Sequence, residues 1–577
     1  MSIVLATAWA DGGSPADDVA ALAAPLLAEG AVLAATAQQA GAAVGCLRWA
    51  GAARPAELHE ADDLILALDG YTIGPARCAS ELADIYRQGS LASLEALDGS
   101  FVMAVVEPAR RVVHVLTDRG GSRPVFVAHE GGRLHAAPQL RCFIRTGIGP
   151  DDLDPAAVLS LLLNAYMLGE TTYLPSVRCL GPARRATLRE RRLTLERYWE
   201  PRFGQTTPRS PADADAAIVR SVAEHLQRFQ RPVIGLSGGV DSRLMLAAAR
   251  AAGIAVQTVT WTYAHEDTEE SDLAVASRVA SAAGVPHRAH RLKWDTLADD
   301  APALVRAADG LVGHLGGLAD RQRLAAELAR EHDALFLGDQ CYRGESEVSS
   351  ADHALEGIGI STLPGPMRRL ARFLMQPDAA ERAMQAYDAA VRKLTPDELR
   401  EMAPQDLHDR LYWAVRLPRL LTGPKALWRR YLDAVSPMLA APVLELAAGL
   451  PGEQRVHKQY LRDAVARLAP DFAAIPYARR SGRVKWRRVL REQGRFQEYL
   501  GRTLLSPDPC FDRWFDRASL RLACRSALGA APAGSGSGGL RRVVRSLLVR
   551  PMLRPPLLLG LLTLRLWMGA WRPADPD

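Results

Sequence analysis

The sequence is poor in lysine and has no closely paired cysteines. Lysine occurs at only five of the 577 positions, so arginine supplies most of the positive charge. The seven cysteines are scattered, and no two of them form a C-x-x-C pair. This spacing indicates neither a zinc site nor a disulfide framework. We therefore expect a protein of the reducing cytoplasm.

Long apolar runs are also missing. The first residues lack a basic region followed by an apolar core, so we predict no signal peptide. Residues 557–571 are apolar, but Gly560 and Arg565 interrupt them, and a membrane span needs about 20 clean residues. We expect this tail either to pack on the parent domain or to make peripheral contact with a membrane.

Chain length and net charge limit the number of domains and the kind of binding partner. A chain of 577 residues predicts two large domains and an extension. The formal net charge of +6 is a weak asymmetry at this length and does not indicate a nucleic-acid partner.

The pattern along the chain predicts an α/β protein. Short strands and glycine-rich turns dominate residues 1–205. Residues 206–528 alternate strands with helices, which predicts a parallel sheet with a ligand at the carboxyl ends of its strands. Residues 529–577 begin with a Gly-, Ser- and Ala-rich stretch, which predicts a flexible linker before an apolar and basic helix.

The stretch Val-Ile-Gly-Leu-Ser-Gly-Gly-Val-Asp-Ser is the strongest functional signal. Its β-branched start predicts a buried strand, and the Ala- and Leu-rich run after it predicts a helix. Between them, Gly238 and Gly239 allow backbone N–H groups to approach an anion at the positive end of that helix. Ser237 and Ser242 add hydroxyl donors, and Asp241 adds a carboxylate suited to Mg2+. No lysine follows the glycines, so this is not the G-x-x-x-x-G-K-[ST] loop.

Three motifs carry a resemblance to a known family. The Ser-Gly-Gly-Val-Asp-Ser string resembles the pyrophosphate loop of the ATP pyrophosphatases, which cleave ATP between the α and β phosphates and leave AMP on a substrate carboxylate or carbonyl. Residues 97–101 and 118–126 resemble the L-x-G-x-F and D-R-x-G-x-x-P patterns of the N-terminal-nucleophile glutaminase domain of asparagine synthetases. Together they resemble the asparagine synthetase B superfamily. The resemblance implies an αββα glutaminase-like domain over residues 1–205 and an adenine-nucleotide α-hydrolase-like synthetase domain over residues 206–528.

Ser2 departs from the family pattern. In the glutamine-using members the mature chain begins with a cysteine, whose thiol attacks the glutamine amide. A hydroxyl is far less nucleophilic than a thiol near neutral pH. We therefore expect an inactive glutaminase and an amine that comes from elsewhere. In lacking this cysteine, the chain resembles the β-lactam synthetases and the lasso-peptide macrolactam synthetases.

The resemblance also implies site residues around the loop. In the family, the residue before the loop and the end of the second strand hold adenine, which points to Leu236 and to the region of Thr260 in this chain. The alternative for both is ordinary packing inside the sheet.

A second metal ligand is expected after the next strand. Gly338 and Asp339 begin a segment that resembles the family's G-E/Y-G-x-D-E motif, whose aspartate shares Mg2+ with the loop aspartate. That aspartate position is Tyr342 here. Either Asp339 or Glu345 takes over as a ligand, or Asp241 and the phosphates hold the metal alone. Asp339 is also a candidate catalytic residue.

The family places a charge-stabilising lysine in an R-x-K motif after Pro470. Lys485 fits the residue type but lies a few positions late, whereas Arg480 fits the position with the wrong residue. We favour Lys485, and a solvated basic face is the alternative. The K-x-x-L-R turn of the family is matched at residues 458–462. Ala440 replaces an aspartate in the segment expected to wall the acceptor pocket.

These features predict an AMP-forming carbon–nitrogen ligase that uses ATP and Mg2+. We favour a lasso-peptide macrolactam synthetase of antibiotic biosynthesis, in which an Asp or Glu side chain of a precursor peptide is adenylated and captured by the peptide's own α-amine. The expected partners are that precursor peptide, its maturation protease and a leader-recognition protein. The alternatives are a β-lactam-type or asparagine-type synthetase acting on a small substrate, and a non-catalytic scaffold.

Overall fold

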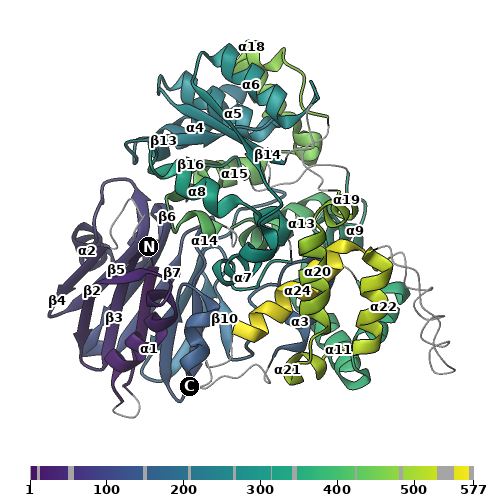
Figure 1. The fold of residues 1–577 in the computed structure, drawn as a ribbon. Coiled ribbons are helices and arrows are strands. Elements are labelled where there is room, and N and C mark those ends of the chain that lie inside the picture. Colours follow the sequence, from purple (N-terminus) through teal and green to yellow (C-terminus); the bar gives the residue numbers. More distant parts are fainter. Residues whose placement is uncertain are drawn as a thin grey trace.

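The computed structural model describes most of the chain: residues 2–9, 13–49, 57–146, 153–205, 210–263, 268–313, 315–340, 347–360, 362–422, 425–479, 485–528 and 552–570. Figure 1 shows a sandwich of two sheets at the N-terminal side, a parallel sheet layered between helices, and a third region made mostly of helices. The linker predicted after residue 528 lies outside the described residues up to residue 551.

Two six-stranded antiparallel sheets form the N-terminal domain. Helix α1 (Pro15–Leu27) covers one sheet, and helix α2 (Ala79–Glu95) covers the other. The first sheet has the order β10 (Val177–Cys179), β8 (Phe126–Glu130), β9 (Arg133–Ala137), β1 (Ser2–Thr7), β3 (Ala42–Trp49) and β2 (Ala31–Gln39). The second has the order β12 (Arg192–Arg197), β11 (Arg184–Arg189), β7 (Val112–Thr117), β6 (Asp98–Glu107), β5 (Leu64–Ile73) and β4 (Glu57–Ala61). The predicted αββα arrangement is confirmed.

Strand β1 illustrates why the sequence forms these layers. Successive side chains of a strand point to opposite faces of its sheet. Ile3 and Leu5 belong to the core between the two sheets, whereas Val4 and Ala6 belong to the core beneath α1. The strand is therefore apolar on both faces and lies inside the domain.

A five-stranded sheet, parallel throughout, organises the second domain. Its order is β15 (His287–Leu292), β14 (Gln257–Tyr263), β13 (Pro232–Gly235), β16 (Ala334–Phe336) and β17 (Asp433–Val435). One face packs against helices that include α4 (Pro211–Leu226), α5 (Val240–Ala251), α6 (Asp272–Ala283) and α17 (Gln459–Leu468). The other packs against α8 (Arg321–Leu328) and α14 (Lys425–Trp428). The parallel sheet predicted from the strand and helix alternation is confirmed.

The remaining elements form the helical region and the connections. They are α3 (Pro155–Asn164), α7 (Leu297–Ala307), α9 (Ala351–Gly357), α10 (Gly365–Leu374), α11 (Pro377–Leu394), α12 (Asp397–Arg400), α13 (Pro404–Leu411), α15 (Ala441–Gly449), α16 (Gly452–Arg455), α18 (Pro470–Ala473), α19 (Trp486–Glu492), α20 (Gly494–Leu505), α21 (Pro509–Asp512), α22 (Arg517–Leu528) and α24 (Pro555–Ala570). The 3-10 helices are η1 (Pro108–Arg110), η2 (Leu140–Thr146), η4 (Leu315–Leu318), η6 (Pro437–Leu439) and η7 (Val456–Lys458), and η5 (Tyr412–Thr422) is an 11-residue π-helix.

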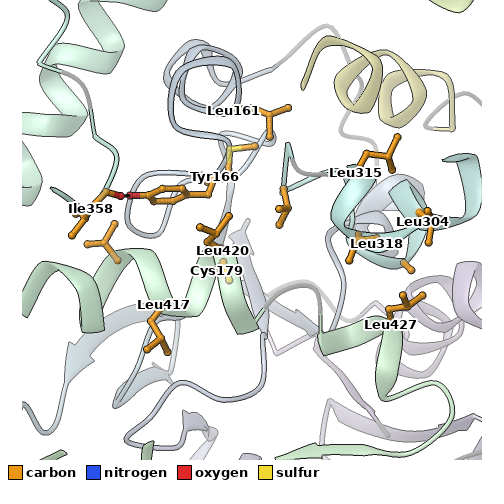
Figure 2. Close-up of a cluster of buried hydrophobic side chains, with 14 of the residues drawn as sticks. Leu161, Tyr166, Cys179, Leu304, Leu315, Leu318, Ile358, Leu417, Leu420 and Leu427 are labelled. Carbon is orange, nitrogen blue, oxygen red and sulfur yellow. Dashed lines mark hydrogen bonds between the residues drawn. The ribbon is translucent and has the colours of Figure 1, made fainter. Parts of the chain in front are cut away.

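An apolar core joins the N-terminal domain to the rest of the chain. Figure 2 shows Tyr166 and Cys179 of the first part beside Ile358, Leu417 and Leu420 of the second. The Tyr166 hydroxyl donates a hydrogen bond to the carbonyl of Ile358 at 2.6 Å. The two parts therefore share one continuous hydrophobic interior.

The C-terminal helix α24 belongs to this interior. It contacts α3, α7, α20 and α22, and most of its side chains are buried. Of the two outcomes expected for the tail, packing on the parent domain is the one observed in residues 555–570. No helix among the described residues has both the length and the apolar character needed to cross a membrane.

Leu561→Ala should measure how much stability α24 contributes. Leu561 is 0% exposed, and truncating a buried leucine costs about 2–5 kcal/mol of unfolding free energy because it leaves a cavity. Leu33→Ala, at a leucine that is 38% exposed, is the matched control and should cost much less. Urea denaturation of both variants checks this, and equal losses would contradict a core position for α24.

Candidate functional site

The loop between β13 and α5 is closed by its two serines. The backbone N–H of Ser237 donates to the hydroxyl oxygen of Ser242 at 2.9 Å, and the N–H of Gly239 donates to the hydroxyl oxygen of Ser237 at 3.2 Å. Thr260 on β14 donates from its hydroxyl to the carbonyl of Leu236 at 2.5 Å. The structure thus brings together all the residues predicted on these two strand ends: Leu236, Ser237, Gly238, Gly239, Asp241, Ser242 and Thr260.

Gly238 is enclosed from both sides. Its N–H donates to Oδ1 of Asp272 at 2.9 Å, and its carbonyl accepts the N–H of Ala478 at 3.1 Å. A Cβ at this position would lie 2.4 Å from that of Ala478, which explains why glycine is needed. Asp272 begins α6, and burial raises the pKa of its carboxyl group. Its carboxylate therefore occupies an N–H that the loop would offer to a phosphate oxygen.

Gly338 allows the end of β16 to lie against the first turn of α5. A Cβ there would lie 2.8 Å from the backbone nitrogen of Ser242 and 3.1 Å from Cβ of Asp241. These separations are shorter than a side chain tolerates, so only glycine fits. The close approach places the next residue, Asp339, beside the loop.

Each of the two predicted site aspartates has a lysine partner. Nζ of Lys458 donates to Oδ2 of Asp241 at 2.5 Å. Nζ of Lys425 lies 2.5 Å from Oδ2 of Asp339, which also accepts a hydrogen bond from the Ser436 hydroxyl at 2.9 Å. Two opposite-charge pairs therefore stand side by side at the carboxyl edge of the sheet.

Burial shapes the charges of both pairs. It raises the pKa of Asp241, while the neighbouring Lys458 charge acts to lower it. It lowers the pKa of Lys425, which is 3% exposed, while the Asp339 charge acts to raise it. The Asp339 charge also raises the pKa of Asp241, because the two carboxylates lie close to each other.

The residues of this edge fit a magnesium ion. Oδ1 of Asp241 is buried and has no hydrogen-bond partner among the described residues, as suits an oxygen that would coordinate a hard cation. Asp339 lies close enough for its charge to act on Asp241, and its role as a second ligand stays a prediction. Within the described ranges no three His, Cys, Asp or Glu side chains gather into a metal-binding group, so phosphate and water oxygens would complete the coordination. Glu345 and Tyr342 lie outside the described residues.

Sequence reasoning missed the roles of both lysines. Lys458 was recognised only as part of a K-x-x-L-R match, and Lys425 was not singled out. His457 and Lys458 have φ values of +54° and +56°, a left-handed conformation that is strained for residues other than glycine. This strained turn directs Lys458 to the loop. The scarcity of lysine was the available signal, because two of only five lysines meet the predicted carboxylates.

Lys485, the predicted charge-stabilising lysine, is exposed. It lies at the start of α19 and borders a groove with Trp486, Arg487, Arg554 and Pro555. Its charge-stabilising role stays a prediction. The alternative, Arg480, lies outside the described residues.

Comparison with family models identifies the family of this chain. The family model described as asparagine synthase matches residues 213–531, which is more than half of the chain. The chain belongs to the asparagine synthase family. This match contains the loop, Asp339 and the lysines at 425 and 458. A model of the glutamine amidotransferase domain matches residues 78–199, so the N-terminal sandwich is amidotransferase-like, as predicted.

Individual relatives are distant. Two relatives are each 28% identical to this chain over 297 residues. Both are named "Putative asparagine synthetase [glutamine-hydrolyzing]", and they come from Mycobacterium bovis (strain AF2122/97) and Mycobacterium tuberculosis (strain H37Rv). The match covers 48% of this chain and 44% of each relative, so the chain spans less than half the length of those relatives. A glutamine phosphoribosylpyrophosphate amidotransferase from B. subtilis, complexed with ADP and GMP, is 13% identical over 50% of this chain and 65% of its own, with a TM-score of 0.24. That likeness is too low to carry an argument.

Lys458→Ala should weaken nucleotide binding at the loop. The substitution removes the cation beside Asp241 and the loop N–H groups, where pyrophosphate charge would lie. Saturating ATP with Mg2+, at about 100 times its Kd, stabilises a folded protein by about 2.7 kcal/mol. We expect the wild type and the control Lys393→Ala, at an exposed lysine of α11, to show this rise in thermal stability. Lys458→Ala should lose most of it, and an undiminished rise would contradict the assignment.

Proposed function

We propose that this protein is an ATP-dependent ligase that joins a carboxylate to an amine through an acyl-adenylate. The observation that carries the proposal is the glycine loop at the carboxyl edge of a parallel sheet, with two carboxylate–lysine pairs beside it. Membership of the asparagine synthase family supports the same chemistry.

The first step forms the adenylate. An oxygen of the substrate carboxylate attacks the α phosphorus of ATP, and the bond to the pyrophosphate oxygen breaks. The N–H groups of Gly238 and Gly239 and the N-terminus of α5 would hold the departing pyrophosphate, after Asp272 has left the Gly238 N–H. Magnesium bound by Asp241 and Asp339 would neutralise charge on the pyrophosphate oxygens.

The second step forms the amide. The amine nitrogen attacks the acyl carbon, the bond to AMP breaks, and the amine loses a proton. Asp339 lies at this edge of the sheet, where Lys425 and Ser436 contact its Oδ2 atom, and its carboxylate would accept that proton. Lys458 would offset phosphate charge during both steps.

The proposed reaction needs an amine, and the residue at position 2, Ser2, helps to identify where that amine comes from. Ser2 begins β1 and is buried, and its hydroxyl stands where a glutaminase would need a thiol. We therefore propose that the amine belongs to the substrate itself. Enclosing both reacting ends of one molecule removes much of the entropic cost of joining them.

A precursor peptide is the substrate class that we favour. We propose that an Asp or Glu side chain of the peptide is adenylated and that its own α-amine closes a macrolactam, with a maturation protease and a leader-recognition protein as partners. Support comes from the apolar segment Met438, Leu439 and Ala440 after β17, because Ala440 offers no charge to hold a small polar amino acid.

ATP–pyrophosphate exchange tests the adenylation step. We expect the wild type to incorporate labelled pyrophosphate into ATP in the presence of a carboxylate peptide, and Asp241→Ala to lose about 100-fold or more of that rate. Asp62→Ala, at an exposed aspartate between β4 and β5, is the control and should keep it. Formation of ADP instead of AMP would exclude the proposed chemistry.

The product identifies the substrate class. Incubation with ATP, a candidate precursor peptide and its maturation protease should give a peptide that has lost one water, together with AMP. Mass spectrometry of the peptide and chromatography of the nucleotides check this. Conversion of free aspartate and ammonia to asparagine, with no change in the peptide, would contradict the macrolactam proposal and favour an asparagine-type synthetase.

A further inference from the structure

We propose that the N-terminal domain acts as a bracket for the synthetase centre. Its residues 98–123 hold residues 429–441 of the second domain, and that segment in turn holds the partners of Asp339. Arg123 and Asp433 are the main positioning residues of the bracket. The inference rests on the proposed function and assigns a role to a domain that lacks the glutaminase cysteine.

Arg123 makes the central contact. Its guanidinium lies 3.1 Å from Oδ1 of Asp69 on β5 and 2.7 Å from Oδ1 of Asp433 on β17, and its Nε donates to the carbonyl of Ser100 at 3.1 Å. Arg123 is 2% exposed. Burial acts to raise the pKa of Asp433, but the charge and hydrogen bond of Arg123, together with other positive charges that include Arg429, keep that pKa below its ordinary value. One buried cation therefore joins a strand of each domain.

A second contact comes from the bend before Arg123. The carbonyl of Ser122 accepts a hydrogen bond from Nη2 of Arg429 at 2.6 Å. Asp118 fixes the bend, because its carboxylate accepts the Ser122 hydroxyl at 2.6 Å and the N–H of Gly120 at 2.9 Å. The arginine beside α14 is thus held by a rigid turn of the N-terminal domain.

Two further contacts reach the segment after β17. Oδ1 of Asp98 accepts the N–H of Ala441 at 3.3 Å. A Cβ at Gly120 would lie 2.8 Å from the carbonyl oxygen of Leu439, so the two backbones touch there. The residues of the L-x-G-x-F and D-R-x-G-x-x-P motifs therefore contact residues 429–441 at four places.

The bracketed segment carries one partner of Asp339, Ser436, which in turn contacts the other, Lys425. Ser436 follows β17 directly, and its hydroxyl bonds both Oδ2 of Asp339 and Nζ of Lys425, at 2.9 and 2.6 Å. The N–H of Leu337, two residues before Asp339, donates to the carbonyl of Val435 at 2.8 Å. A shift of β17 would therefore move the hydroxyl that orients Asp339 and loosen the strand end that carries it.

Asp433→Asn tests the bracket, with Asp309→Asn as the matched control. Each change removes the negative charge of one buried carboxylate at the domain interface and keeps the size of the side chain. Asp309 accepts the backbone N–H of Leu140 at 2.8 Å, and none of its hydrogen bonds within the described part of the chain involves residues 429–441. We expect Asp433→Asn to lower kcat for amide formation by about 100-fold, because displacing a reacting group by about 1 Å can cost that much. The KM for ATP should stay within about 2-fold of the wild-type value. Asp309→Asn should change neither by more than about 2-fold, and Asp433→Glu should regain part of the lost kcat.

Hydrogen exchange separates failure of the bracket from failure of the proposed function. In Asp433→Asn the amides of Leu337 and Ala441 should exchange at least about 10-fold faster than in the wild type, whereas Asp309→Asn should leave them unchanged. Unchanged exchange at both amides would overturn the bracket whatever the enzyme does. Faster exchange with unchanged kcat would overturn the positioning of Asp339. If the wild type is inactive but the two amides exchange faster in Asp433→Asn, the proposed function is refuted. The contact between the N-terminal domain and residues 429–441 would still be supported.

Discussion

The burial of opposite charges at one edge of a parallel sheet is the constraint on which the rest of the site depends. A lone buried carboxylate is costly, and a neighbouring cation offsets that cost only when the geometry is good. Asp241 and Asp339 each meet this condition through a lysine. Lysines from distant parts of the chain must therefore reach the same point, which the strained turn at His457 and the buried start of α14 achieve.

Glycine sets the distances on which these charges depend. At Gly338 a side chain would collide with the first turn of α5, and at Gly238 it would collide with Ala478. Both positions are close approaches of backbone, which the absence of Cβ permits. The two strand ends and the first turn of α5 consequently form one compact surface for a polyanion.

The sequence was sufficient for the local site and insufficient for its long-range partners. The strand, loop and helix at residues 233–251 could be predicted because each is coded by neighbouring residues: a β-branched run, two glycines and an Ala-rich run. Arg123 and Asp433 are 310 positions apart, so no local pattern relates them. Lys425 lies 86 positions after Asp339, and its role depends on a three-residue strand, β17, that propensity alone does not specify. The apolar character of residues 557–571 could be predicted from the sequence, but only the packed structure shows which helices cover α24.

The contact between Asp272 and Gly238 bears on turnover. A carboxylate that already accepts the Gly238 N–H would compete with a phosphate oxygen for the same donor, so under the proposed function it would lower the affinity for ATP. The same competition would act in reverse after the proposed reaction. As pyrophosphate left, Asp272 would retake the N–H and oppose rebinding, so a residue that weakens the entry of ATP would also favour the departure of its product.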